Sequence, residues 1–205
     1  MVEVEGPAET RPAPEKAVRP SAAMPRTELG VRTDPPDLAR ACRRSAADLE
    51  ALALPDVLDR RRRLVAAGIP WFVALFGRDS LIAGHQARAV FPDQLMHTLE
   101  ALAARQGTVD DPANDEQPGK ILHEVRLTRR PWLGHGTTAG ARPYFGSIDA
   151  TPLWLILFGT AFRWGAPRAD LEDLLPAARA ALRWIRGAGD PDGDGLLEYL
   201  SLIHI

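Results

Sequence analysis

Apolar side chains recur at helical spacing along much of this chain and are interrupted by short breaks rich in Pro and Asp. One such stretch predicts a helix that is capped by Asp79 or Ser80 and runs through Val90. A break at residues 91–93, Phe-Pro-Asp, separates it from a second helix that ends near Gln106. Two helices with so short a connection form an antiparallel helical hairpin.

The same pattern returns further along the chain. Thr151 and Pro152 suit the N-cap and the first position of a helix that reaches Arg163. Pro176 must lie in the first turn or at a kink of the helix that follows. Because no alternation typical of strands is apparent, the sequence predicts an all-α protein. The apolar stripe of the second helix is formed by Leu171, Leu174, Leu175, Ala178, Leu182 and Ile185.

Three further segments precede these hairpins. Asp37 suits the N-cap of a helix that runs to Pro55, and residues 57–66 predict a second helical piece. Its basic cluster, Arg60–Arg63, indicates a solvated helix face rather than an anion site. Residues 1–36 are rich in Pro, Ala, Glu and Arg and contain scarcely any large apolar side chains, which predicts a disordered arm.

Composition narrows the classes of function. With 25 basic and 27 acidic residues the chain is nearly neutral, which argues against nucleic acid or an anionic membrane as a partner. The single Cys42 excludes an internal disulfide and suits a reducing compartment. No apolar run approaches the roughly 20 residues that span a bilayer, and the N-terminus lacks the apolar core of a signal peptide. We therefore expect a cytoplasmic protein.

The segment IPWFVALFGRDSLIAG, residues 69–84, places the charges of Arg78 and Asp79 inside an apolar and aromatic run. Burying such charges costs free energy unless they are paired or take part in function. A guanidinium and a carboxylate can hydrogen-bond sugar hydroxyls, while an aromatic ring covers the apolar face of the sugar. Residue chemistry leaves two interpretations open: a sugar-binding pocket, or a buried pair that anchors a loop to a helix start. The aromatic candidates are Trp71, Phe72 and Phe76.

Asp, Asn, Pro and Gly punctuate residues 107–142, where only Ile121–Leu127 indicates a strand or a short helix. A connection this long in a compact domain is more often functional than idle. His123 and Glu124 have side chains suited to acid–base chemistry. Ordinary loop contacts, with an ion pair from Glu124 to Arg126, explain them equally well. Glu124 is the stronger candidate for contact with a sugar or a pocket wall.

Four motifs, in order and at sensible spacing, resemble those of a known family. They are FGRDS at 76–80, NDEQPGKILHEVR at 114–126, YFGSIDATPLW at 144–154 and GDPDGDGLLEY at 189–199. Together they resemble the bacterial glycogen debranching enzymes of the amylo-alpha-1,6-glucosidase type, which belong to the six-hairpin glycosidases. The resemblance covers roughly residues 45–199. It implies that residues 37–199 form the N-terminal part, about the first two hairpins, of an (α/α)6 toroid.

The resemblance also assigns expected roles. It implies that Arg78 and Asp79 bind the hydroxyls of the terminal sugar in the subsite where cleavage occurs. It aims Asp149, and Tyr144 with it, at the same pocket. An alternative stays open, in which Asp149 only caps the helix that begins at Thr151. The expected partner is an oligo- or polysaccharide, chiefly a glycogen-like glucan with alpha-1,6 branches, and no cofactor is expected.

Glycoside hydrolysis requires two carboxyl groups beside the scissile bond. The resemblance implies an inverting mechanism whose general acid and base lie in segments beyond Ile205, so we expect this polypeptide to be inactive alone. Two alternatives are a mannosylglycerate hydrolase-like glycosidase of the same toroid and a non-catalytic carbohydrate-binding toroid. Residues 200–205 depart from the family pattern and match the translation of a sequencing adapter. They predict a non-native tail on a chain truncated at its C-terminus.

Residues 190–195, Asp-Pro-Asp-Gly-Asp-Gly, resemble the start of a calcium-binding loop. An EF-hand requires a bidentate Glu at the twelfth position, where Ser201 stands, whereas Glu198 falls at the ninth. A tight turn between helices accounts for the Asp and Gly residues without a metal. We therefore expect no metal in this loop.

Overall fold

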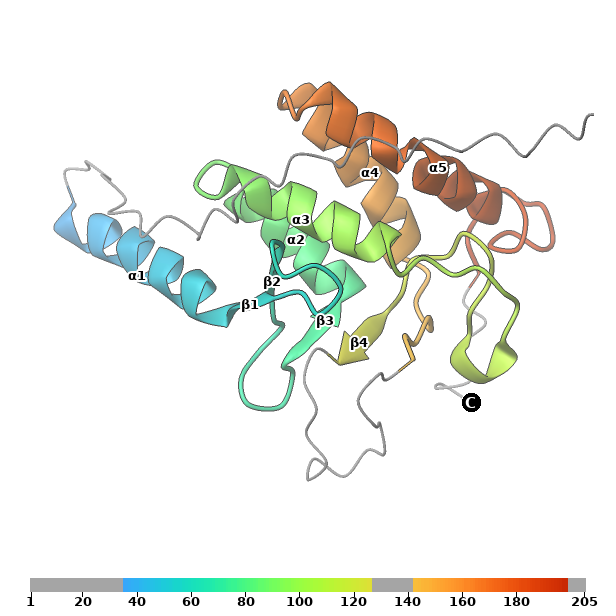
Figure 1. Ribbon diagram of the computed structural model, residues 1–205, viewed down its shortest axis with the longest axis horizontal. Helices are drawn as coiled ribbons and strands as arrows, with labels where there is room; N and C mark the ends of the chain where they lie inside the picture. Colours follow the sequence, from blue (N-terminus) through green and yellow to red (C-terminus); the bar gives the residue numbers. More distant parts are fainter. Residues whose placement is uncertain (1–34, 127–141, 199–205) are drawn as a thin grey trace, which may run out of the picture.

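The computed structural model describes residues 35–126 and 142–198, and within them the chain is rich in helix. Four strands of three residues each form two separate two-stranded antiparallel sheets (Figure 1). The all-α prediction is therefore too strict, because strands this short carry too few positions for alternation to be read. The helices are α1 (Pro36–Leu52), α2 (Gly77–Ala87), α3 (Pro92–Ala103), α4 (Ala150–Arg163) and α5 (Arg168–Ile185). The remaining elements are β1 (Ala53–Pro55), β2 (Arg63–Val65), β3 (Ala74–Phe76), the 3-10 helix η1 (Pro112–Asn114) and β4 (Glu124–Arg126).

Both predicted helical hairpins are present, as α2 with α3 and α4 with α5. Helix α4 also packs against α2 and α3, so the two hairpins share one core (Figure 1). Trp154 is fully buried there, and its indole Nε1 donates a hydrogen bond to the Leu99 carbonyl oxygen, 3.0 Å away. This bond satisfies the polar atom of a large aromatic side chain that the core encloses. The buried apolar side chains around it include Leu81, Leu95, Leu99, Leu102, Leu157 and Leu174.

The predicted helix N-caps are displaced by two to four residues. Helix α2 begins at Gly77, with Asp79 in its first turn and no side-chain cap. The N-cap of α4 is Asp149 rather than Thr151, whose hydroxyl instead accepts a hydrogen bond from the Ile121 amide at 2.9 Å. A tertiary contact thus occupies the group that the sequence assigned to the cap. Pro176 lies in the interior of α5, beyond its first turn.

The N-terminal predictions need larger corrections. Helix α1 ends at Leu52, and Asp37 lies in its first turn, after the N-cap Pro35. The predicted helix over residues 57–66 is wrong, because β1 and β2 pair through this region in an antiparallel hairpin with Ala53 opposite Val65. The expected arm, apart from residues 35 and 36, and the expected tail at 200–205 lie outside the described residues.

Several large apolar side chains of the second hairpin face solvent, among them Ile156 and Phe162 of α4 and the adjoining Trp164. Trp164 also stacks under the guanidinium of Arg88, whose Cζ lies 4.4 Å from the ring centroid. None of the helices within the described ranges combines the length and the apolar character needed to cross a bilayer.

Candidate functional site

Arg78 and Asp149 form an ion pair that joins the two helical hairpins. The Arg78 Nη1 atom donates a hydrogen bond to Asp149 Oδ2 at 2.8 Å, across 71 residues of sequence. The Asp79 carboxylate is a more distant neighbour, with its Oδ2 atom 4.0 Å from Arg78 Nε. All three side chains are partly open to solvent, with exposed fractions of 50% for Arg78, 49% for Asp79 and 35% for Asp149. Of the two interpretations left open for Arg78 and Asp79, the buried anchoring pair is therefore wrong.

Asp149 occupies the N-cap position of α4 but makes no side-chain cap hydrogen bond. Its backbone adopts the right-handed helical conformation, with φ −85° and ψ −28°, whereas a capping side chain usually belongs to an extended residue. The second carboxylate oxygen, Oδ1, is buried and finds no hydrogen-bond partner among the described residues. A buried acceptor left without a donor costs free energy, so ordinary helix capping does not account for this carboxylate.

The backbone beside this pair is held by strand pairing. Strand β3 leads directly into α2 and pairs with β4, which sets Phe76 opposite Glu124. On the other side of β4, Glu124 exchanges backbone hydrogen bonds with Tyr144, at 3.1 and 2.9 Å. The Gly77 amide then donates to the His123 carbonyl oxygen at 2.8 Å. Three segments distant in sequence, each carrying one of the motifs, thus meet at the start of α2.

Aromatic rings form a row across these segments. Phe72 and Phe76 have ring centroids 6.1 Å apart, Phe76 and His123 lie 5.6 Å apart, and His123 and Tyr144 lie 5.8 Å apart. Each pair meets edge to face, which is a favoured arrangement for aromatic side chains. His123, the weaker candidate of its cluster, is therefore the ring that links Phe76 to Tyr144.

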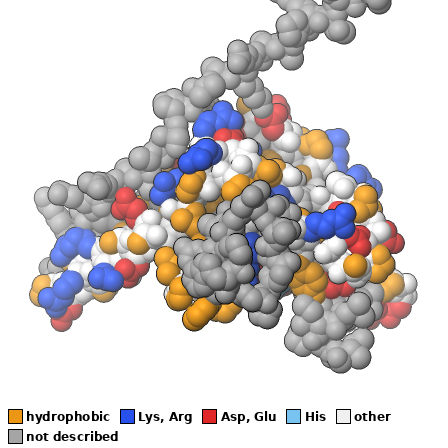
Figure 2. Space-filling view, turned by 60° about the horizontal axis from the view of Figure 1, so that its bottom comes forward, with side chains coloured by type: hydrophobic (Ala, Val, Ile, Leu, Met, Phe, Trp, Pro, Cys, Tyr) orange, Lys and Arg blue, Asp and Glu red, His pale blue; other side chains and the backbone are white. Residues whose placement is uncertain are grey.

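Trp71 lies in the exposed loop before β3. Its carbonyl oxygen accepts a hydrogen bond from Arg126 Nη1 at 2.7 Å, which ties the loop to β4. The predicted ion pair between Glu124 and Arg126 does not form in the described part of the chain. Side chains of Ile69, Trp71 and Phe72 are exposed. Their loop lies at the bottom of Figure 1, and Figure 2, which turns that side forward, shows hydrophobic side chains gathered there.

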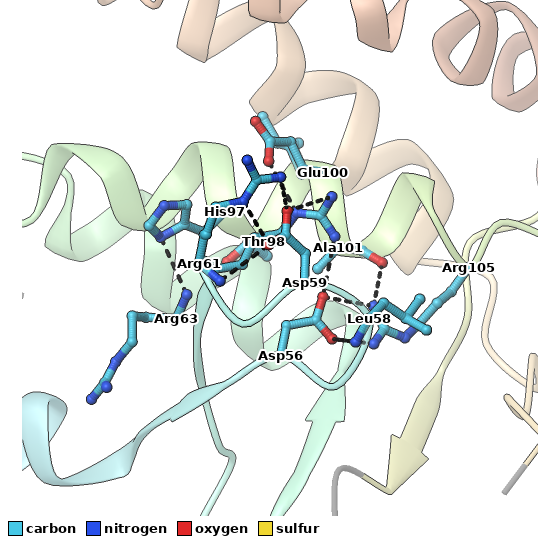
Figure 3. A network of polar contacts seen from close by, with 12 residues as sticks. Asp56, Leu58, Asp59, Arg61, Arg63, His97, Thr98, Glu100, Ala101 and Arg105 are labelled. Carbon is cyan, nitrogen blue, oxygen red and sulfur yellow. Dashed lines mark hydrogen bonds and ion pairs between the residues drawn. The ribbon is translucent and has the colours of Figure 1, made fainter. Parts of the chain in front are cut away.

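The basic cluster Arg60–Arg63 is a second site of charge pairing. The helix predicted for it is wrong, whereas the predicted exposure to solvent holds for Arg60 and Arg61. Asp56 is fully buried between Arg105 and Arg62, and Nη1 of each arginine lies 3.2 Å from its Oδ2 atom. Arg62 also reaches Glu100 of α3, with Nε 3.1 Å from Oε2. Figure 3 shows how this network clamps the β1–β2 hairpin onto α3. Arg62 and Arg105 are therefore structural, whereas Arg60 and Arg61 are exposed to solvent.

The pKa values within the network follow from its hydrogen bonds and from burial. The side-chain hydrogen bonds of Arg61 hold the pKa of Asp59 at about 2, although burial acts in the opposite direction. Burial acts to raise the pKa of Asp56, but hydrogen bonds from Arg105, the Leu58 amide and Arg62 outweigh it and lower the value. Burial lowers the pKa of His97, whose Nδ1 atom accepts the Arg63 amide at 3.4 Å.

The loop at residues 190–195 brings the carboxylates of Asp190, Asp192 and Asp194 close together, with one oxygen of each within 4.8 Å of the others. Two of these carboxylates already accept hydrogen bonds from backbone amides: Gly195 donates to Asp190 at 3.1 Å, and Leu196 donates to Asp194 at 2.8 Å. Such bonds are typical of a tight turn built by Asp side chains. The expectation that the loop holds no metal stays a prediction.

Of the sequence-predicted residues, the structure brings Arg78, Asp79 and Asp149 together, and strand pairing brings Phe76, Glu124 and Tyr144 beside them. Trp71 is linked to this group through its backbone. Ser147 and Asp115 lie within two of the sequence motifs but were not predicted as site residues. Ser147 is buried, with no hydroxyl partner among the described residues, and Asp115 bonds Tyr144. Neither a scan against models of known protein families nor a search of curated proteins finds a match to this chain.

Proposed function

We propose that this chain carries the sugar-binding part of a glycoside hydrolase that acts on alpha-glucosidic bonds, with alpha-1,6 branches of glycogen-like glucans as the preferred substrate. The observation that supports it most is the Arg78–Asp149 pair, which presents a guanidinium and a carboxylate side by side, both partly open to solvent. The two residues come from two different motifs of the family resemblance. Chemistry and resemblance therefore favour the same place in the molecule.

The groups present suit the hydroxyls of a sugar. A guanidinium donates several hydrogen bonds in a fixed plane, whereas a carboxylate only accepts them. Neighbouring hydroxyls on a pyranose ring both donate and accept, so a donor beside an acceptor binds them in pairs. Arg78 and Asp149 provide this combination, and Asp79 adds a second half-exposed carboxylate. Phe76 and Tyr144 provide apolar ring surface in the adjoining aromatic row.

We also propose that the α2–α3 and α4–α5 hairpins are two consecutive units of an (α/α)6 toroid. Their side-by-side packing supports this arrangement, because stacked hairpins bury each helix against its neighbours. The hydrolytic step requires an acid and a base. The resemblance assigns both to segments other than these two hairpins, so what we propose for the residues of the hairpins is sugar binding.

Calorimetric titration of the full chain with maltotetraose tests the binding proposal. We expect saturable binding that Arg78→Ala weakens at least tenfold, equivalent to about 1.4 kcal/mol. Asp149→Asn should weaken it similarly, because an amide nitrogen cannot accept a hydrogen bond. Arg183→Ala, which removes an exposed arginine from α5, is the matched control and should leave the affinity unchanged. Equal affinities for Arg78→Ala and the wild type would contradict the proposal.

The same titration separates the alternative functions. Binding of mannosylglycerate in preference to maltotetraose would favour the mannosylglycerate hydrolase-like alternative. Linkage is tested with cellotetraose, which contains the same glucose units in β-linkage and should bind more weakly if the site selects alpha-glucosides.

A further inference from the structure

Tyr144 is held from several sides within the candidate site. Its phenol hydroxyl donates a hydrogen bond to Asp115 Oδ2 at 2.8 Å, and its ring meets His123 edge to face. The ring also lies directly on Gly146, where an added Cβ would overlap the phenol oxygen. Strand pairing with Glu124 fixes the backbone at the same position. Together these contacts restrain the orientation of the side chain.

Asp115 itself has an unusual backbone. Among the described residues it is the one non-glycine residue with a positive φ, 53°, a left-handed conformation that costs free energy for a residue with a Cβ. Such a conformation persists where the surrounding structure holds it. Asp115 directly follows η1. The N-cap of η1, Asp111, accepts hydrogen bonds from the Ala113 amide at 3.1 Å and from Asn114 Nδ2 at 2.7 Å.

The loop that carries Asp115 is fastened to α5. Gln117 Oε1 accepts a hydrogen bond from the Trp184 indole at 2.7 Å, and an added Cβ at Gly119 would overlap the Ala180 carbonyl. Lys120 Nζ donates to the Asp115 carbonyl oxygen at 3.1 Å and lies 5.6 Å from the centroid of the Trp184 ring. Asp115 is therefore supported on its backbone side by α5 and bonds Tyr144 with its side chain.

We propose that Asp115 is a positioning residue for the candidate site: it fixes the phenol of Tyr144, and with it the aromatic row, in the orientation that receives the sugar. This rests on the proposed function for the nature of the ligand. Because the phenol hydrogen is committed to the carboxylate, the Tyr144 oxygen offers the ligand only lone pairs. Helix α5 contributes to the site through this chain of contacts, although none of its own residues is a predicted ligand.

The test compares Asp115→Gly with Asp115→Asn. Glycine adopts a positive φ without cost, so Asp115→Gly removes the carboxylate and leaves the loop conformation favourable. Asparagine also tolerates this conformation, and its amide oxygen can still accept the phenol hydrogen bond. Asp110→Gly, at an exposed aspartate of the same loop, is the matched control. Any defect caused merely by a more flexible loop should appear in that control as well.

The first readout is the ring signal of Tyr144 in protein labelled with ¹³C-tyrosine. The chain has two tyrosines, so Tyr144→Phe assigns the spectrum and Tyr199 provides an internal reference. We expect Asp115→Gly to shift the Tyr144 ring signals, and Asp115→Asn and Asp110→Gly to leave them near their wild-type positions. Unchanged Tyr144 signals in Asp115→Gly would overturn the proposal, whether or not the chain binds sugar.

The second readout is the affinity for maltotetraose. Asp115→Gly should weaken it at least fivefold, Asp115→Asn should keep it within twofold, and Asp115→Gly should have no further effect in a Tyr144→Phe background. Unchanged affinity in Asp115→Gly, or additive losses in the double variant, would overturn the positioning role. A wild-type chain that binds no maltotetraose would instead contradict the proposed function, while the Tyr144 signal still decides whether Asp115 fixes the ring.

Discussion

The two Arg–Asp clusters of this chain use the same side chains in opposite surroundings. Around Asp56, both oxygens of a fully buried carboxylate accept hydrogen bonds from Arg105, which is itself only 6% exposed. Around Asp149, one oxygen bonds a half-exposed Arg78, and the other has no partner in the part of the chain that the structure describes. The first cluster is complete in itself, whereas the second has hydrogen-bonding capacity left over.

This contrast indicates how a charged pair divides between structure and function. A buried carboxylate without its partners would be strongly destabilising, so the first cluster is useful only when fully satisfied. An exposed pair contributes little to stability, because water competes for both groups. Its removal is therefore tolerated, and it remains available to a ligand. Three experiments test whether the two clusters really differ in this way.

The largest expected effect is on stability. Asp56→Ala leaves the buried Arg105 without its counter-charge and should lower the free energy of unfolding by about 3–5 kcal/mol. Asp149→Ala should lower it by less than about 1 kcal/mol, because that pair is partly exposed. Urea denaturation followed by circular dichroism measures both. Equal losses in the two variants would remove the distinction between the clusters.

A second experiment tests the backbone that holds the Arg78–Asp149 pair in place. A Cβ at Gly77 would overlap the Leu122 carbonyl, a backbone atom that cannot move aside. Gly77→Ala should therefore cost about 1–3 kcal/mol of stability and also weaken sugar binding, since it displaces the start of α2 next to Arg78. Gly159→Ala is the control: no heavy atom lies within 4 Å of its added Cβ, and alanine favours the helix by up to about 1 kcal/mol. Similar losses for both variants would contradict the steric argument.

The smallest effect concerns pH. The hydrogen bonds from Arg61 hold the pKa of Asp59 at about 2 in the folded chain, below its ordinary value of 3.8. The ionised carboxylate therefore stabilises the folded state above about pH 4, and this contribution is lost as the pH falls towards 2. We expect it to be about 1 kcal/mol, because solvent screens the exposed Arg61. Asp59→Asn should remove this part of the acid dependence measured in thermal melts between pH 2 and 6, and an unchanged profile would contradict it.

Local sequence signals were sufficient for the helical hairpins. The apolar positions of α5 recur over several turns, so the helix is recognised without tertiary information. The break before α3 is equally clear from its local sequence. Local sequence signals were insufficient for β1 to β4, because a three-residue strand is defined by its partner rather than by its own periodicity. The helix predicted over residues 57–66 failed for this reason: Asp56 and Arg62 are directed into a network with Arg105, 49 residues from Asp56.

The sequence by itself determined which residue types were available at the candidate site. It indicated Arg78, Asp79 and Asp149 through their motifs, but it left open whether Asp149 only capped a helix. Tertiary structure decided that question, because the Arg78–Asp149 bond depends on how two hairpins pack and on which atoms water can still reach. Burial and pairing across 71 residues are properties of the folded chain, and these properties decided that one cluster closes on itself while the other remains open.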